Sequence, residues 1–344
     1  LVFGLLLSLF SNNIFLIWLG LELNMFSVIP FLNSSVSENN NVFFLNTSEI
    51  NVSFYYFFVQ VIGSILFTWG AVMSSWYVLG IIGLIVKIGI APFFWWVPAL
   101  INRLDWFSIG IISTIQKVPG VFLFRFVFDL SIEVCVLLSL MGFIVAVIGI
   151  NFSFNNLKLV LAWSSVSNMS ILFVLIVLNN SFGFIYYFFY SFLVILLCLV
   201  LNNSFSNVFC DSFLNGNNIN NNMLVGLLLL IFSGLPPFLS FLLKIYFLGG
   251  FYFFDFSVFV EGFEMVNPTT FYYLVASNLS NYFIVMVYII LIIFQSVGYI
   301  KTFIALFSTG SSRLSSSVFV LNSNFNLILS LSVLYFFSIF FYMI

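Results

Sequence analysis

The sequence predicts an all-helical protein that crosses a lipid membrane many times. Of its 344 residues, 63% are hydrophobic and only 5% are charged, and the mean hydropathy is +1.24. A soluble domain carries roughly 25% charged residues, so this chain has too few to form a solvated shell. Its apolar runs are continuous rather than alternating, which excludes a β-barrel and favours helices. The predicted fold class is an all-α polytopic membrane protein.

Eleven apolar runs qualify as membrane spans, because a bilayer core of about 30 Å takes about 20 apolar residues per helix. Clusters of Asn, Ser and Gly separate the runs. The expected spans are 1–11, 14–32, 54–73, 76–98, 106–128, 131–150, 157–178, 181–201, 223–248, 272–303 and 318–343. The long loops are 33–53, 202–222 and 249–271. The first span looks truncated, so we expect residues to precede Leu1.

Basic residues near the span ends predict an orientation, because Lys and Arg gather on the cytoplasmic side or on its mitochondrial equivalent, the matrix. One side contains Arg103, Lys158, Lys301 and Arg313, whereas the other contains only Arg125. The acidic residues of that second side are Asp129, Glu133, Asp255, Glu261 and Glu264. We therefore expect the basic side to face the cytoplasm or the matrix.

Four ionisable residues fall inside expected spans, where a charge costs about 2.5 kcal/mol or more and indicates a functional site. They are Glu22 in W-L-G-L-E-L-N, Lys87 in I-V-K-I-G-I-A-P-F, Lys117 in T-I-Q-K-V-P-G and Lys244 in F-L-L-K-I-Y. A structural ion pair, or a lysine close to a helix end, is the alternative interpretation for each.

Helix-breaking residues accompany two of these lysines. Gly89, Pro92 and Pro98 follow Lys87, and Gly234, Pro236 and Pro237 precede Lys244. Proline removes a backbone donor and clashes with the preceding turn, which predicts an interrupted helix at each place. Broken helices persist at membrane depth only where they are buried or line a wet cavity. Ordinary kinked helices are the alternative.

The two interrupted spans are the fourth and the ninth, an offset of five helices. Interrupted helices in corresponding positions of two halves indicate an inverted-repeat transporter. We expect one membrane-embedded domain over residues 1–344. Its first five-helix repeat covers about 1–128, its second about 131–303, and a C-terminal helix about 318–343.

These features suggest proton transfer. Burial favours the neutral form of a lysine, and a nearby carboxylate favours the charged form. A change in the distance or hydration of the Glu22 and Lys87 pair would therefore switch Lys87 between the two forms. Lys117 would accept the proton and Lys244 would pass it to the far side. The residues that could order connecting waters are Ser164, Ser165, Ser167, Asn168 and Ser170. Packing between helices is the other explanation for these small polar residues.

The composition argues against redox, metal and nucleic-acid chemistry. Histidine, the commonest general base and the usual haem ligand, is absent. The three cysteines, Cys135, Cys198 and Cys210, form no C-x-x-C motif, so we expect no iron–sulfur cluster, zinc site or disulfide framework. With 8 basic and 10 acidic residues, the chain has a net charge of −2, which does not suggest nucleic-acid binding.

At the charged residues, the sequence resembles the subunit 2 family of mitochondrial NADH dehydrogenase (NADH:ubiquinone oxidoreductase, respiratory complex I). The matching stretches are W-L-G-L-E-L-N-M at 18–25, K-I-G-I-A-P-F-F-W-W-V-P at 87–98, L-D-W and T-I-Q-K-V-P within 104–119, N-N-L-K-L-V-L-A-W-S-S-V-S-N-M at 155–169, Y-Y-F-F-Y-S-F at 186–192 and G-L-P-P-F-L-S-F-L-L-K at 234–244. They occur in the family's order across almost the whole chain. The resemblance is weak in 33–53 and 249–316.

The resemblance implies an antiporter-like subunit, with eleven helices, in the proton-pumping arm of that complex in the mitochondrial inner membrane. It assigns the family's key carboxylate to Glu22 and its three lysines to Lys87, Lys117 and Lys244. It also implies that the loops holding Arg103, Lys158 and Arg313 face the matrix.

The implied partners are other membrane-arm subunits, including sister antiporter-like subunits, together with membrane lipids and protons. No cofactor is expected in this chain, although the complex as a whole uses NADH, FMN, iron–sulfur clusters and ubiquinone. Many relatives have His at the positions of Phe94 and Asn168. Either those histidines are dispensable, which we favour, or water, Ser and Asn replace them here.

Two other functions fit the sequence. A freestanding cation/proton antiporter would have the same broken helices and buried lysines, but it would work without neighbouring subunits. A scaffold subunit would keep the lysines as inert residues.

Overall fold

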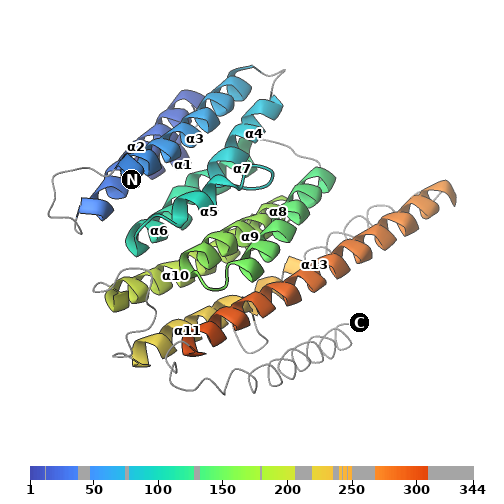
Figure 1. The fold of residues 1–344 in the computed structure, drawn as a ribbon. Helices are drawn as coiled ribbons and strands as arrows, with labels where there is room; N and C mark the ends of the chain where they lie inside the picture. The colour runs from blue at the N-terminus through green and yellow to red at the C-terminus, as the bar shows by residue number, and fades with distance from the viewer. Residues whose placement is uncertain are drawn as a thin grey trace. The chain divides into compact units, whose positions relative to one another are not determined.

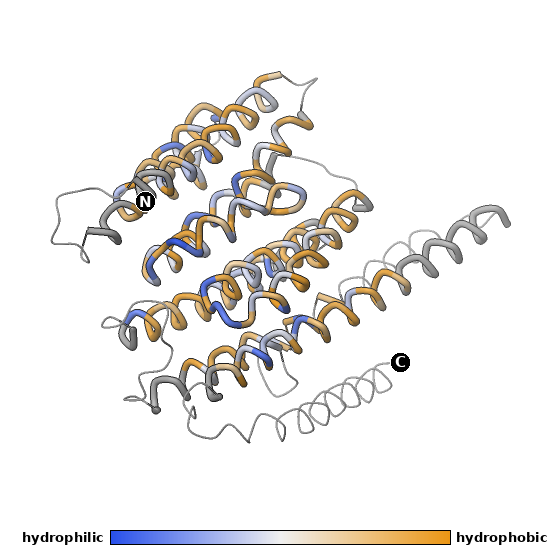
Figure 2. Tube along the Cα trace, viewed as in Figure 1, coloured by the Kyte–Doolittle hydropathy of each residue, from blue (hydrophilic) through white to orange (hydrophobic). Residues whose placement is uncertain are grey.

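In the part of the chain that it describes, the computed structural model consists of helices joined by short non-helical connections (Figure 1). The described residues are 1–11, 13–37, 47–73, 77–127, 132–178, 180–205, 219–234, 240–241, 243–245, 247–249 and 268–308. Within them, seven helical segments are long and apolar enough to cross a membrane. Hydrophobic residues dominate these helices (Figure 2). The predicted all-α polytopic fold is confirmed.

The helices follow the expected spans closely. The first seven are α1 (Val2–Phe10), α2 (Ile14–Ser37), α3 (Thr47–Val72), α4 (Tyr77–Ile88), α5 (Trp96–Ile101), α6 (Trp106–Ser113) and α7 (Val118–Val127). The others are α8 (Ile132–Phe152), α9 (Leu157–Leu178), α10 (Asn180–Phe205), α11 (Ile219–Ser233) and α13 (Pro268–Ser308). Each of the first ten expected spans contains a described helix. The eleventh, 318–343, lies outside the described residues.

The fourth span is interrupted, as predicted. Helix α4 ends at Ile88, and Gly89 adopts a φ of 78°, a left-handed conformation that is common just after a helix end. A non-helical stretch that contains Pro92 then leads to α5. Pro98 lies in the first turn of α5, where its missing N–H leaves no helical bond unmade.

The ninth span is also interrupted after its first helix. Helix α11 ends at Ser233, Gly234 adopts a φ of 74°, and helical structure is present again at 240–241. Pro236 and Pro237 lie outside the described residues.

The fifth span differs from the expected continuous helix over 106–128. Helix α6 ends at Ser113, Thr114 adopts φ −118° and ψ −84°, and a 3₁₀ turn over Ile115–Lys117 leads into α7. Pro119 explains the restart, because proline lacks the N–H that would continue the earlier helix but is well tolerated in a first turn. Lys117 therefore lies at a helix break, as Lys87 does.

The backbone divides into two compact units. Unit 1 comprises Leu1–Ala146 and Lys158–Asn203, and unit 2 comprises Val147–Leu157 and Ser204–Ile344. In unit 1, helices α1 to α4 pack in succession, and α7 packs against α1 and α4. In unit 2, α11 packs against α13, and the end of α8 reaches α13 through a hydrogen bond from the Asn151 amide to the Phe294 carbonyl at 3.1 Å. The repeat boundaries near 128 and 131 stay a prediction.

Candidate functional site

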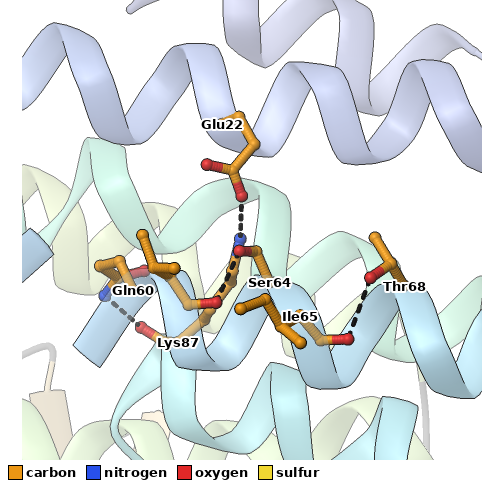
Figure 3. A network of polar contacts seen from close by, with 7 residues as sticks. Glu22, Gln60, Ser64, Ile65, Thr68 and Lys87 are labelled. Carbon is orange, nitrogen blue, oxygen red and sulfur yellow. Dashed lines mark hydrogen bonds and ion pairs between the residues drawn. The ribbon is translucent and has the colours of Figure 1, made fainter. Parts of the chain in front are cut away.

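Glu22 on α2 and Lys87 on α4 form an ion pair inside unit 1 (Figure 3). The Lys87 Nζ lies 4.0 Å from the Glu22 Oε1, and the two side chains are only 6% and 13% exposed. At this separation the charges attract each other without a hydrogen bond between them. The structure thus brings the sequence-predicted pair together.

The Glu22 carboxylate has an incomplete set of partners. Its Oε1 and the Tyr56 hydroxyl on α3 are both buried, and neither has a hydrogen-bond partner among the described residues. Buried polar groups are usually satisfied by protein or by ordered water. Tyr56 was not found from the sequence, because nothing in α3 indicates which tyrosine faces α2.

Two side chains bind the backbone carbonyls that the end of α4 leaves without helical partners. The Gln60 Nε2 donates to the Lys87 carbonyl at 3.3 Å, and the Trp96 Nε1 donates to the Val86 carbonyl at 3.0 Å. Gln60 and Trp96 are 2% and 1% exposed. Because the last carbonyls of a helix must find other donors when buried, these bonds hold the break at Lys87 in place. Neither residue was a sequence candidate.

Lys117 is buried beside the second break of unit 1. Its Nζ donates to the Ser165 hydroxyl on α9 at 3.4 Å, and it has no carboxylate partner within the described part of the chain. The Thr114 carbonyl accepts both the Lys117 backbone N–H at 2.9 Å and the Tyr187 hydroxyl from α10 at 2.5 Å. Tyr187 therefore holds the turn that carries Lys117, a role that the sequence does not predict.

The segments that carry Lys87 and Lys117 are neighbours. A Cβ placed on Gly120, one turn after Lys117, would lie 2.5 Å from the Ile88 Cγ1, and Ile88 follows Lys87. Only glycine permits this approach of α7 to the end of α4.

The polar residues of α9 are mostly satisfied within their own helix. The hydroxyls of Ser164, Ser165, Ser167 and Ser170 each donate to the carbonyl three residues earlier. The Asn168 amide donates to the Ser164 carbonyl at 2.8 Å and accepts a hydrogen bond from the Tyr186 hydroxyl at 2.6 Å. Of the five predicted water-ordering residues, Ser165 contacts Lys117. Phe94, the other departure from the family, packs against Trp163.

Lys244 is buried in unit 2 among neutral acceptors. Its Nζ donates to the Ser233 carbonyl and to the Gln295 Oε1, each at 3.0 Å. A Cβ on Gly234 would lie 2.9 Å from this Nζ, so the glycine at the break leaves room for the ammonium group. The Lys244 ammonium group thus lies at the C-terminal end of α11, where backbone carbonyls favour a positive charge.

The basic residues of the predicted matrix side are partly described. Arg103 is exposed, and the Lys158 ammonium lies 5.6 Å from the centre of the Trp106 ring. Arg313 lies outside the described residues. Among those that are described, no group of three or more His, Cys, Asp or Glu side chains could hold a metal ion.

Interrupted membrane helices with buried ionisable side chains near the breaks are typical of membrane transporters. The transmembrane model of the NADH:quinone oxidoreductase/Mrp antiporter family matches residues 71–263, more than half of the chain. The chain belongs to this family.

Curated relatives are similar over most of their length. The chain is 28% identical over 261 residues to NADH-ubiquinone oxidoreductase chain 2 of Anopheles gambiae, covering 71% of this chain and 72% of that one. It is 29% identical over 248 residues to the protein of the same name from Artemia franciscana, covering 71% and 76%.

Solved structures share the fold. A chain of the Mrp complex from Dietzia sp. DQ12-45-1b matches with a TM-score of 0.69 at 12% identity, over 87% of this chain and 57% of that one. This protein therefore spans little more than half of the Mrp chain. A chain of respiratory complex I from Thermus thermophilus matches with a TM-score of 0.61 at 16% identity, over 90% and 68%.

Proposed function

We propose that this chain is a proton-translocating, membrane-arm subunit of NADH:ubiquinone oxidoreductase, respiratory complex I, in the mitochondrial inner membrane. Family membership and the names of the two curated relatives support the assignment. The observation that carries the mechanism is the buried Glu22–Lys87 ion pair beside the segment of Lys117.

In the proposed cycle, Lys87 is charged while Glu22 is near. When the pair separates, burial favours neutral Lys87, and its proton passes to neutral Lys117, so the net charge of the two lysines is unchanged. Ser165, which accepts a hydrogen bond from Lys117, lies on the route. In unit 2, Lys244 carries the proton onward, held by the Ser233 carbonyl and Gln295.

The proposed partners are the other membrane-arm subunits, including sister antiporter-like subunits, and membrane lipids. NADH, FMN, iron–sulfur clusters and ubiquinone belong to the complex as a whole, and this chain contributes no redox centre. Arg103, Lys158 and Arg313 are proposed to face the matrix. Their orientation can be tested by the access of a membrane-impermeant thiol reagent to cysteines placed in those loops.

A freestanding cation/proton antiporter is the second candidate, favoured by the likeness to the Mrp chain. Purification from mild detergent separates the two proposals. A complex I subunit copurifies with an assembly that oxidises NADH, whereas a lone antiporter purifies apart from that activity and transports cations after reconstitution.

Substitution of Lys87 by Met tests the mechanism within the assembled complex. If the lysine carries protons, the number of protons pumped per NADH oxidised falls. If the Lys87→Met complex assembles and pumps the same number of protons per NADH oxidised, the scaffold interpretation is correct and the proton-transfer role of Lys87 is wrong.

A further inference from the structure

One turn of α3, from Gln60 to Gly63, touches Lys87 at both its backbone and its side chain. The Gln60 Nε2 donates to the Lys87 carbonyl at 3.3 Å (Figure 3). A Cβ added to Gly63 would lie 2.7 Å from the Lys87 Cγ, a distance that real Cβ atoms do not show. The lysine stem therefore occupies the space that a larger residue at position 63 would fill.

The backbones of α3 and α4 allow this arrangement by approaching closely. A Cβ on Gly83 would lie 2.6 Å from the Gly63 carbonyl oxygen and 2.5 Å from the Phe67 backbone nitrogen. This glycine contact brings α4 against α3 one turn before Lys87. Small residues at membrane helix contacts permit such packing.

The direction of the Lys87 side chain follows from these contacts. With its carbonyl bound by Gln60 and its stem lying over Gly63, the ammonium group extends toward α2 and reaches Glu22 (Figure 3). Gln60 itself does not contact the carboxylate or the ammonium group in any hydrogen bond of the described residues. Its hydrogen bond to the Lys87 carbonyl instead links it to the pair through the position of Lys87.

We propose that the Gln60–Gly63 turn positions Lys87 for proton transfer, Gln60 by holding its backbone carbonyl and Gly63 by leaving space for its side chain. Both are positioning residues. The inference rests on the proposed function, because it assigns a role in the movement of protons by Lys87.

The test uses Gln60→Met and Gly63→Ala in the assembled complex. Methionine keeps the length of the glutamine side chain but cannot donate, and alanine adds the Cβ that displaces the Lys87 stem. Each variant should lower proton pumping by about two- to a hundredfold, the range of coupling between contacting residues, and shift its pH profile. Thr68→Val is the control for Gln60, because the Thr68 hydroxyl donates within α3 to the Ile65 carbonyl. Gly110→Ala is the control for Gly63, because its Cβ would meet Cys198 at an ordinary 3.4 Å.

A double-mutant cycle separates positioning from general stability. In a Lys87→Met background, Gln60→Met and Gly63→Ala should cause no further loss of pumping, since the group they position is gone. Additive losses in that background would overturn the proposal, and so would unchanged pumping and pH profile in both single variants.

The Lys87→Met variant alone distinguishes this failure from failure of the proposed function. If it pumps normally, the proposed function fails. If Lys87→Met pumps fewer protons while the Gln60 and Gly63 variants pump normally, only the positioning role is wrong. Where a variant does not assemble, an experimental structure of the unaltered complex decides: Gln60 bound to the Lys87 carbonyl is expected, and Gln60 turned away from it would overturn the proposal.

Discussion

The Lys244 ammonium donates a hydrogen bond to the Gln295 side-chain oxygen at 3.0 Å, and its other described acceptor is the Ser233 carbonyl. Both acceptors are neutral, whereas Lys87 has the Glu22 carboxylate at 4.0 Å. Neutral acceptors hold a charged lysine less strongly than a carboxylate does. Lys87 and Lys244, in the two spans predicted to correspond, thus have different partners: a carboxylate for Lys87 and neutral acceptors for Lys244.

Replacing Gln295 by Glu should slow proton pumping by the complex. A carboxylate beside Lys244 would stabilise the charged form, and about 1.4 kcal/mol of added stabilisation biases the two forms tenfold. We expect NADH-driven proton pumping to fall by about this factor while the complex still assembles. Pumping by the purified, reconstituted complex is the measurement, and Gln295→Glu with pumping equal to that of the unaltered complex would refute the prediction.

Replacing Glu22 by Gln should remove the charge that stabilises the charged form of Lys87. An opposite charge at this distance changes the ratio of charged to neutral partner by about tenfold or more. Glu22→Gln removes that charge at constant size, so fewer protons should be pumped per NADH oxidised. Glu22→Asp keeps the charge and should restore part of the loss. Equal ratios in both variants would show that the charge of Glu22 does not matter.

Removing the Tyr187 hydroxyl should loosen the break at Lys117. Tyr187→Phe deletes the hydrogen bond to the Thr114 carbonyl, at a cost of about 1 kcal/mol. We expect faster thermal inactivation and weaker pumping. Tyr55→Phe is a suitable control, because Tyr55 is a half-buried tyrosine whose ring contacts Trp95, outside this break. Identical behaviour of the two variants would exclude the role given to Tyr187.

Alanine at Gly89 should destabilise the end of α4. The left-handed φ of 78° disfavours any side chain by about 1 kcal/mol, and the new Cβ would lie 2.5 Å from the Val97 Cγ2. The yield of assembled complex should therefore drop. Gly249→Ala, whose Cβ would meet no atom of the described residues within 4 Å, should leave the yield unchanged. A normal yield for Gly89→Ala would contradict the geometry of this break.

The charged residues and the glycines at two breaks could be predicted from the sequence, for a physical reason. An ionisable group in a continuous apolar run is costly, so Glu22, Lys87, Lys117 and Lys244 stand out without knowledge of packing. Glycine beside proline indicates an interruption in the same direct way.

The residues that hold those lysines could not be predicted. Gln60, Tyr56, Tyr187 and Gln295 lie on helices whose sequences are apolar on all sides, so no periodic pattern shows which face meets a neighbour. The break before Lys117 was missed because Pro119 follows it, and proline in a first turn is compatible with a helix that simply continues. The roles of the four residues on these apolar helices depend on which helices pack together. The structures of unit 1 and of unit 2 supply that information.

Proton transfer through the buried lysines is best measured as the number of protons pumped per NADH oxidised by the Lys117→Ala variant in the assembled complex. Lys158→Ala, at a helix start beside Trp106, is the matched control. A lowered ratio for Lys117→Ala and an unchanged ratio for Lys158→Ala are the predicted results. A fully assembled Lys117→Ala complex that pumps at the unaltered ratio would contradict proton transfer through these buried lysines.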